Sequence, residues 1–231
     1  MILLAIDTSA NLCAAALYDC DSHSVIAEKS EDIGRGHAER LMGLLAELLD
    51  EAGLAYRDLN QIAVTSGPGS FTGIRVGLAT ARGLALGLGL KVIGINVLEA
   101  IAFQHNSAPN DTPIVVALDA KRREVFLQIF SPSSEQLSKP LAVPIEQIGK
   151  IIPKQPIRIA GSASNVVAEQ ISRLANPPEI EICSNQNTAS IADIANLAAR
   201  LKPDANRPVP LYLRSADAKP QNNFALKRAA S

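Results

Sequence analysis

The sequence of 231 residues is poor in the residue types that metal and redox sites need. It has no tryptophan, three histidines and three cysteines. No two histidines have the i, i+4 spacing of a helical zinc site, so a zinc peptidase or a di-metal site lacks its ligands. Cys13, Cys20 and Cys183 form no CxxC pair and cannot all pair with one another, which favours reduced thiols in the cytoplasm.

A basic excess and long apolar runs are also missing. The formal net charge of −1 excludes general electrostatic binding of nucleic acid, so such a role must be local or shared with a partner. No uncharged apolar run reaches membrane-spanning length, and no GxSxG nucleophile motif occurs. The opening MILLAIDTS has no basic residue before Asp7, which predicts a strand and not a signal peptide. We therefore expect a soluble, cytoplasmic protein with no membrane association.

The order of the apolar segments predicts an α/β fold, and a hydrophobic content of 47% is ample for its core. Three short strands and a helix precede an alternation of strands and helices, which is typical of parallel strands covered by helices. The elements expected in residues 1–106 are strands at 2–6, 12–18 and 25–28, a helix at 36–52, a strand at 61–65, a helix ending near 89, a strand at 91–95 and a helix at 97–104.

A similar order begins again after a polar, proline-containing stretch near residue 107, which predicts a second, reduced subdomain over residues 107–206. Its expected elements are strands at 114–118 and 125–130, a short helix at 145–152, a strand at 157–160, a helix at 162–174, a strand at 180–183 and a helix at 190–201. Residues 207–231 carry five basic residues against one acid and little apolar content near their end, so we expect a basic, partly disordered extension.

A glycine-containing loop follows the strand at 61–65 and leads into a helix. Together with the polar end of the first strand it forms a candidate phosphate or vestigial nucleotide site, whose residues are Asp7, Thr8, Ser9, Gly67, Gly69 and Ser70. The glycine spacing differs by one residue from a dinucleotide fingerprint, and no Lys-Ser or Lys-Thr pair follows for a Walker loop. A tight turn that redirects the chain, and an Asx or Ser/Thr turn that closes the strand, remain alternatives.

The helix after this loop has a row of small residues at intervals of four, which are Gly73, Gly77, Ala81, Ala85 and Gly89. Its remaining positions are largely apolar, and a helix that is apolar nearly all round is buried on more than one side. We therefore expect it to form a subunit interface with the helix at 36–52, although packing on the protein's own sheet is an alternative. The expected interface residues are His37, Leu41, Leu45, Leu48, Gly73, Ile74, Gly77, Leu78, Ala81 and Ala85.

Five segments resemble those of the TsaB (YeaZ) family. Members of this family are a subunit of the bacterial machinery that makes threonylcarbamoyladenosine in transfer RNA. The five segments are ILLAIDTS at 2–9, HAERLMGLL at 37–45, SGPGSFTGIRVGLATARGLALG at 66–87, ALDAKRREVF at 117–126 and PLYLR at 210–214. The resemblance implies an actin/hexokinase-like fold of two ribonuclease-H-like halves with mixed sheets. It also implies a non-catalytic paralogue of the catalytic subunit TsaD.

The HxEGH metal motif of TsaD aligns with the segment VLEAI at 97–101, in which aliphatic side chains replace both histidines and only Glu99 survives. Because aliphatic side chains cannot coordinate a cation, the resemblance implies no catalytic or metal-binding residues in this chain.

The resemblance implies partners as well. The chain would pair with TsaD through the helices at 36–52 and 71–89, would form a homodimer through the same surface, and would act with TsaE. ATP or ADP and a metal would bind in the TsaD-containing complex and not to this chain alone. Transfer RNA would be contacted through the complex, or directly through the basic tail. The alternative function is an ATP-dependent phosphotransferase or peptidase-like enzyme that uses Asp7 and the loop Gly67–Gly73.

Overall fold

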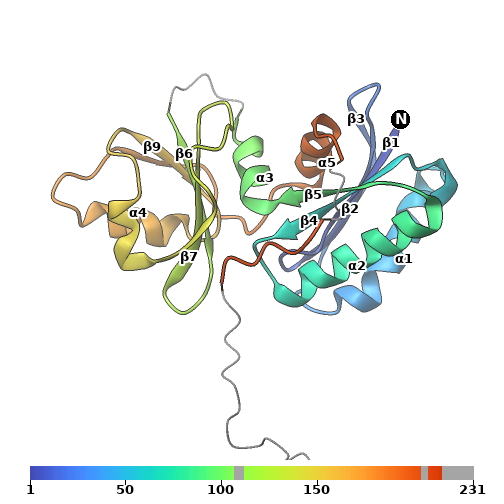
Figure 1. Cartoon of the computed structure of the whole chain (residues 1–231), viewed down its shortest axis with the longest axis horizontal. Helices are drawn as coiled ribbons and strands as arrows, with labels where there is room; N and C mark the ends of the chain where they lie inside the picture. Colours follow the sequence, from blue (N-terminus) through green and yellow to red (C-terminus); the bar gives the residue numbers. More distant parts are fainter. Residues whose placement is uncertain (107–111, 204–207, 215–231) are drawn as a thin grey trace, which may run out of the picture.

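The computed structural model describes residues 1–106, 112–203 and 208–214. The character predicted for the tail therefore lies outside the described residues, except for the stretch 208–214. The described chain forms two lobes, each built around a five-stranded sheet (Figure 1).

The first sheet contains the strands of the N-terminal hundred residues in the order β3-β2-β1-β4-β5. β1 pairs antiparallel with β2 and β2 with β3, whereas β1–β4 and β4–β5 are parallel. The third strand is longer than the sequence predicts. The strands are β1 (Ile2–Asp7), β2 (Leu12–Asp19), β3 (Ser24–Asp32), β4 (Gln61–Gly67) and β5 (Val92–Asn96).

The second sheet repeats this arrangement in the order β10-β9-β6-β7-β8, with β6–β7 and β7–β8 antiparallel and β6–β9 and β9–β10 parallel. Its strands are β6 (Ile114–Asp119), β7 (Glu124–Phe130), β8 (Leu141–Pro144), β9 (Ile157–Ala160) and β10 (Ile180–Ile182). The sequence did not predict β8, because it is only four residues long and ends in proline. The predicted duplicated actin/hexokinase-like fold of two ribonuclease-H-like halves is confirmed.

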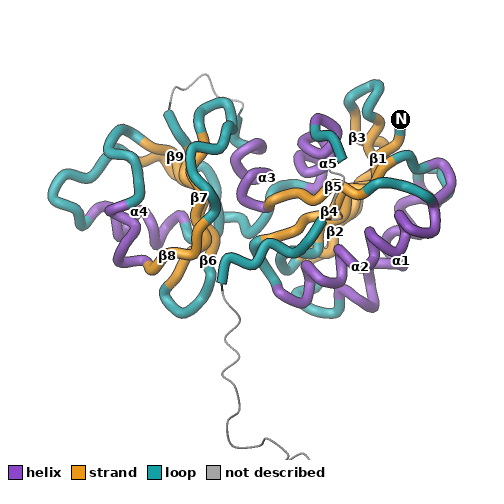
Figure 2. Tube along the Cα trace, viewed as in Figure 1, coloured by secondary structure: helices purple, strands orange, loops and turns teal. Residues whose placement is uncertain are grey.

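Helices form three layers around the two sheets (Figures 1 and 2). α1 (His37–Glu51) and α2 (Phe71–Leu88) cover the outer face of the first sheet. α3 (Val97–Gln104) and α5 (Ile191–Arg200) lie between the sheets, in a core to which both sheets contribute. α4 (Ser164–Ser172) and the 3₁₀ turn η2 (Ile145–Lys150) cover the outer face of the second sheet. A second 3₁₀ turn, η1 (Tyr56–Asp58), precedes β4.

The position of α5 corrects the predicted subdomains. The sequence places this helix in a second subdomain of residues 107–206, but α5 packs on β1, β2 and β3 of the first sheet. Its apolar side, which includes Ile191, Ile194 and Ala198, is buried in the core between the sheets. The chain therefore returns to the first half before it ends, and the second half is not one continuous segment.

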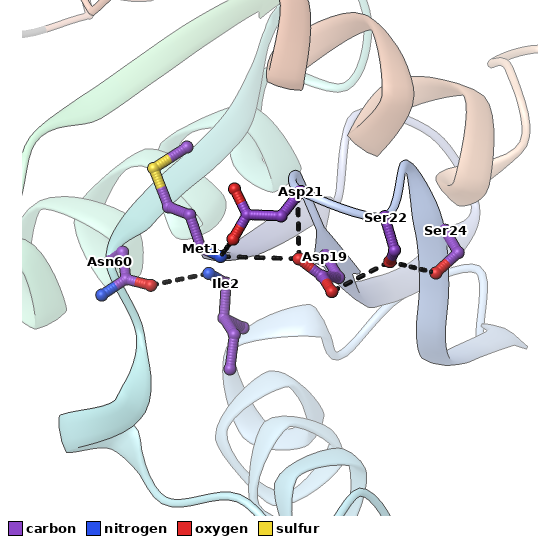
Figure 3. A network of polar contacts seen from close by, with 7 residues as sticks. All are labelled: Met1, Ile2, Asp19, Asp21, Ser22, Ser24 and Asn60. Carbon is purple, nitrogen blue, oxygen red and sulfur yellow. Dashed lines mark hydrogen bonds and ion pairs between the residues drawn. The ribbon is translucent and has the colours of Figure 1, made fainter.

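The start of β1 is held by polar contacts to segments on both sides of it (Figure 3). The α-amino group of Met1 forms ion pairs with Asp19 and Asp21, and the amide of Ile2 donates to Asn60 Oδ1 at 2.6 Å. The hydrogen bond that this amino group donates to Asp21 is the main cause that raises its pKa above the ordinary value. These contacts fix the first strand, which delivers Asp7 to the opposite edge of the sheet.

Candidate functional site

Asp7 lies at the C-terminal end of β1 and is buried. Its Oδ1 accepts hydrogen bonds from Thr65 Oγ1 at 2.6 Å and from the amide of Ser9 at 2.9 Å, and its Oδ2 accepts one from Thr188 Oγ1 at 2.7 Å. The bond from Ser9 closes an Asx turn, which is the alternative that the sequence left open. The carboxylate thus holds together β1, β4 and the segment before α5.

The glycine loop packs directly on the end of β1. The amide of Ser70 donates to the carbonyl of Ser9 at 2.7 Å, and Thr8 Oγ1 donates to the carbonyl of Gly73 at 2.8 Å. A side chain at Gly69 would overlap the carbonyl of Ser9, and one at Gly73 would overlap that of Thr8. Gly67 has φ 106 and precedes a cis peptide bond. These glycines are required by close backbone approach, which supports the turn alternative.

The six predicted phosphate-site residues therefore lie together, but most of their polar groups are bound to one another. Ser70 caps α2 by accepting a hydrogen bond from the amide of Gly73 at 3.2 Å, so two amides of the loop and helix start are already used. Ser9 is an exception, because its buried hydroxyl has no hydrogen-bond partner. Among the described residues, no group of three or more histidine, cysteine or acidic side chains is placed to hold a metal ion.

The segment that aligns with the metal motif of TsaD forms the start of α3. Val97, Leu98, Ala100 and Ile101 are buried in the core between the sheets. Glu99 is half-buried, and this burial raises the pKa of its carboxyl, although a hydrogen bond with Gln136 opposes the shift. The aliphatic side chains at these positions are thus part of the packing that joins the two halves.

The ten predicted interface residues require a correction. All ten are buried within the chain itself, in the layer where α1 and α2 cover the first sheet. A side chain at Gly77 would overlap Thr8 Oγ1, so this row of small residues lets α2 approach β1 and β4 closely. The alternative of packing on the protein's own sheet is correct for them, because the apolar face of each helix turns towards the sheet.

The outer face of the same helices includes other residues that are small or apolar, together with four exposed acidic residues of α1, which are Glu39, Glu47, Asp50 and Glu51. Leu86 of α2 is 75% exposed and Met42 of α1 is 47% exposed. Ala79, Gly83 and Gly87 form a second row of small residues at intervals of four on α2, and all three are exposed. The sequence contains this second row as well, but the predicted interface residues all lie on the side of the two helices that packs on the sheet.

A cleft of about 760 Å³ lies between the two lobes and is lined by residues of both. One wall is the C-terminal segment 208–214, which runs between the halves (Figure 1). The amide of Leu211 donates to the carbonyl of Ser66 at 2.8 Å, and Arg214 forms an ion pair with Glu124 of β7. The sequence offered this segment only as the motif PLYLR, and nothing in it showed that the motif forms a wall of the cleft.

Comparison with known proteins agrees with this architecture. The sequence profile of the family described as TsaD, tRNA N6-adenosine threonylcarbamoyltransferase, matches residues 24–223. Two relatives are named tRNA threonylcarbamoyladenosine biosynthesis protein TsaB. The one from Escherichia coli is 36% identical over 129 residues, and the one from Bacillus subtilis is 35% identical over 130 residues. The chain belongs to the TsaD family, in its TsaB (YeaZ) branch.

The matched region spans about half of these TsaB relatives, namely 53% of the Escherichia coli protein and 55% of the Bacillus subtilis protein, and 54% and 56% of this chain. An uncharacterized protein of Mycobacterium tuberculosis is 32% identical over 218 residues, or 94% of each chain. The structure of YeaZ from Pseudomonas aeruginosa superposes with a TM-score of 0.76 at 27% identity and covers 92% of this chain and 99% of that one. Within the described ranges, no helix is long and apolar enough to cross a membrane.

Proposed function

We propose that the chain is the TsaB-type subunit that binds TsaD and supports it in forming threonylcarbamoyladenosine in transfer RNA, without catalysing the reaction itself. TsaD, with TsaE and ATP, would transfer the threonylcarbamoyl group to the adenosine beside the anticodon. Nucleotide and metal would bind in the TsaD-containing complex. The observation that carries the proposal is the outer face of α1 and α2.

The part of this outer face that α2 contributes has the composition of a helix-packing surface. α2 contains no acidic residue, and its exposed Ala79, Gly83 and Gly87 leave space for another backbone. Added side chains at Gly83 and Gly87 would contact nothing within 4 Å. Glycine within a helix costs about 1 kcal/mol relative to alanine, and the packing of the free chain does not explain Gly83. A partner helix that packs closely against this row would explain the glycine at this position.

The same surface supports self-association. An isologous dimer forms when one patch is complementary to itself, and two antiparallel copies of α1 and α2 would make a four-helix layer. TsaD is a paralogue of this chain according to the family resemblance, so it would present equivalent helices. We therefore infer that the homodimer and the heterodimer with TsaD compete for one surface.

The candidate phosphate site supports a non-catalytic role. Both oxygens of Asp7 accept hydrogen bonds from protein donors, and an enzyme that used this carboxylate to hold a metal would have to break them. The start of α3 carries buried aliphatic side chains where the metal motif of TsaD aligns.

An enzyme of the phosphotransferase or peptidase type remains the second candidate. One structure of the Pseudomonas aeruginosa relative is described as similar to peptidase YEAZ, and Ser9, whose buried hydroxyl has no hydrogen-bond partner, is among the residues that line the cleft. Calorimetric titration of the isolated chain with ATP and magnesium separates the candidates. We expect no tight binding and no modification of transfer RNA by the isolated chain. Tight ATP binding by the chain alone would favour the enzyme.

Arginine at Gly83 or at Leu86 tests the partner surface. Both positions are exposed, so the variants Gly83→Arg and Leu86→Arg should fold, and the added charge should block close helix packing. The matched control is Leu137→Arg, because Leu137 is an exposed apolar residue of the other lobe. We expect co-elution with TsaD on a sizing column to be lost for both α2 variants and kept for the control.

The thermal unfolding of each variant shows whether it is folded. If both α2 variants are folded and still co-elute with TsaD as the wild type does, this surface is not the interface, and the proposed function loses its main support. A homodimer that dissociates in the α2 variants but not in the control, measured by analytical ultracentrifugation, would show that self-association uses the same face.

A further inference from the structure

The glycine loop contributes to the lining of the cleft between the lobes, but its polar groups are partly bound within the chain. The amide of Ser70 is bound to the carbonyl of Ser9, and the carboxylate of Asp7, which is not among the lining residues, is bound to three donors. The mouth lies between the start of α2, the C-terminal segment and the turn from β6 to β7, each of which contributes to its lining. A ligand of this cleft would therefore be recognised mainly at the mouth.

Two aromatic rings and an arginine form a stack at the mouth. Phe71 is 55% exposed and Tyr212 is 47% exposed, and their ring centroids lie 5.4 Å apart at 31°. The guanidinium carbon of Arg75 lies 3.7 Å from the centroid of Phe71, and Arg75 Nε donates to Tyr212 Oη at 2.8 Å. Exposed aromatic faces beside an arginine are the usual platform on which proteins stack nucleobases.

The charge at the mouth is net positive. The turn from β6 to β7 contains three consecutive basic residues, Lys121, Arg122 and Arg123, and Arg214 follows on the C-terminal segment. Ion pairs join Asp119 to Lys121, Glu146 to Arg123 and Glu124 to Arg214. Among the described residues that line the cleft, Arg75, Lys121 and Arg214 are basic and Asp119 is acidic, which is a local excess of positive charge in a chain of net charge −1.

The conformation of this turn is unusual. Lys121, Arg122 and Arg123 have φ values of 62°, 54° and 62°, in the left-handed region that non-glycine residues seldom adopt. Arg214 Nη2 donates to the carbonyl of Lys121 at 3.2 Å, so the C-terminal segment is bound to this turn. Backbone in such a region is found preferentially at functional sites, which agrees with a ligand at the mouth.

We propose that the mouth of this cleft binds an unpaired nucleotide of an RNA chain. The base extends the stack of Phe71, Arg75 and Tyr212, and the adjoining backbone phosphates lie near Lys121 and Arg214. Asn11 and Asn187 also line the cavity, and their side-chain amides offer hydrogen bonds to a base edge or ribose. This inference rests on the proposed function, because it adds a direct RNA contact to a subunit that serves RNA modification.

RNA fits these observations better than a free nucleoside triphosphate. A triphosphate needs a cradle of free amides and a metal-binding carboxylate, whereas the amides of Ser70 and Gly73 are bound within the chain and Asp7 accepts three internal hydrogen bonds. A strand that passes the open mouth needs only a stacking surface and a modest positive charge. The side-chain amides of Asn11 and Asn187 in the lining can add polar contacts to such a strand.

Fluorescence polarisation with a labelled single-stranded RNA of about ten nucleotides tests the proposal on the full chain and on its complex with TsaD. We expect Phe71→Ala and Tyr212→Ala each to weaken binding about tenfold. Lys121→Gln should lower the salt dependence of binding by about one phosphate contact. The controls are Leu137→Ala for an exposed apolar residue outside the cleft and Lys154→Gln for an exposed lysine elsewhere in the second lobe.

Ultraviolet cross-linking to the same RNA, followed by peptide mass spectrometry, should identify the peptides that contain Phe71 and Tyr212. The proposal is overturned if the folded aromatic variants bind RNA as the wild type does, if cross-links fall only elsewhere, or if ATP but not RNA binds the cleft. Co-elution with TsaD, measured on the same variants, separates the RNA-binding inference from the proposed function. If the aromatic variants co-elute with TsaD and bind RNA as the wild type does, only the RNA-binding inference fails. The proposed TsaD-binding surface is tested separately by the Gly83→Arg variant.

Discussion

At the scale of single residues, Asp7 joins three segments that lie far apart in the sequence. Thr65 is 58 residues away and Thr188 is 181 residues away, yet both hydroxyls donate to its carboxylate. A buried carboxylate costs much less free energy when all its nearby donors are satisfied, and each donor in turn depends on it. We conclude that Asp7 is a structural residue that fixes the segment before α5 to the first sheet.

The substitution Asp7→Ala should therefore act on stability. It would leave the hydroxyls of Thr65 and Thr188 buried without their acceptor, which we expect to lower the free energy of unfolding by about 3 kcal/mol. Urea unfolding measures this change. The exposed carboxylate Asp50 provides a control, and Asp50→Ala should change stability by less than about 0.5 kcal/mol. A stable Asp7→Ala variant that instead loses a ligand-dependent activity would show that Asp7 is functional.

At the scale of elements, α2 carries two rows of small residues that serve different purposes. Successive residues are about 100° apart around a helix, so rows that are offset by two residues lie on nearly opposite sides. The row at 73, 77, 81 and 85 is buried against the sheet, and the row at 79, 83 and 87 is exposed. One face of α2 thus completes the core, and the other remains available to a partner.

Alanine at Gly77 and at Gly83 distinguishes the two faces. Gly77→Ala would force a methyl group onto Thr8 Oγ1 and Val64, and we expect it to destabilise the chain by about 1–3 kcal/mol. Gly83→Ala meets nothing within 4 Å and should stabilise the free chain by about 0.5–1 kcal/mol through helix propensity. Thermal unfolding compares the two, and equal effects would contradict the assignment of faces.

The same pair of variants also bears on the proposed partner surface. If partner helices pack closely on the outer row, Gly83→Ala should weaken co-elution with TsaD even though it stabilises the free chain. An unchanged affinity would mean that no backbone approaches Gly83 in the complex.

At the scale of the whole molecule, α5 and the C-terminal segment are among the connections that hold the lobes together besides the core between the sheets. α5 returns to the first sheet, and the segment 208–214 runs from Ser66 of the first lobe to Glu124 of the second. The segment 208–214 also forms a wall of the cleft. The position of one lobe relative to the other and the shape of the cleft therefore depend on the same segment.

Stability of the whole molecule should fall in acid. Several exposed carboxyls have a pKa below the ordinary value, mainly because hydrogen bonds stabilise their charged form. They are Asp19, Glu31, Glu47, Asp119 and Glu146. A lowered pKa in the folded state gives stability that is present above the unfolded pKa of about 4 and is lost as the pH falls through the folded pKa.

Glu99 acts in the opposite direction. Burial raises the pKa of its carboxyl, so its contribution to stability is present at low pH and is lost as the pH rises. Among the described residues, five carboxyls with a lowered pKa make the folded chain less stable in acid, and Glu99 alone has the opposite effect. We therefore expect the urea midpoint to be lower at about pH 3 than at about pH 7. Added salt should reduce the difference, because the five carboxyls are exposed and screened. A midpoint that rises towards pH 3 would contradict this expectation.

Local sequence signals determined a large part of this structure. The apolar runs and their spacing predicted most of the strands and helices and the repetition of the order in two halves, because burial on one or two faces leaves a periodic pattern in the chain. The spacing of Gly69 and Gly73 marked a place where backbones approach closely. The strand β8 was missed because four residues ending in proline carry too little of such a pattern.

Only the tertiary structure decided which side of α2 is buried, because both sides carry small residues at the same interval. It alone brought Thr188 to Asp7, placed α5 on the first sheet and laid the segment 208–214 beside Phe71 and Arg75. These contacts join residues more than 130 positions apart, and no local periodicity encodes them. They depend on how two complete sheets pack, which is why the sequence identified the residues of the loop and helix but the fold determined their roles.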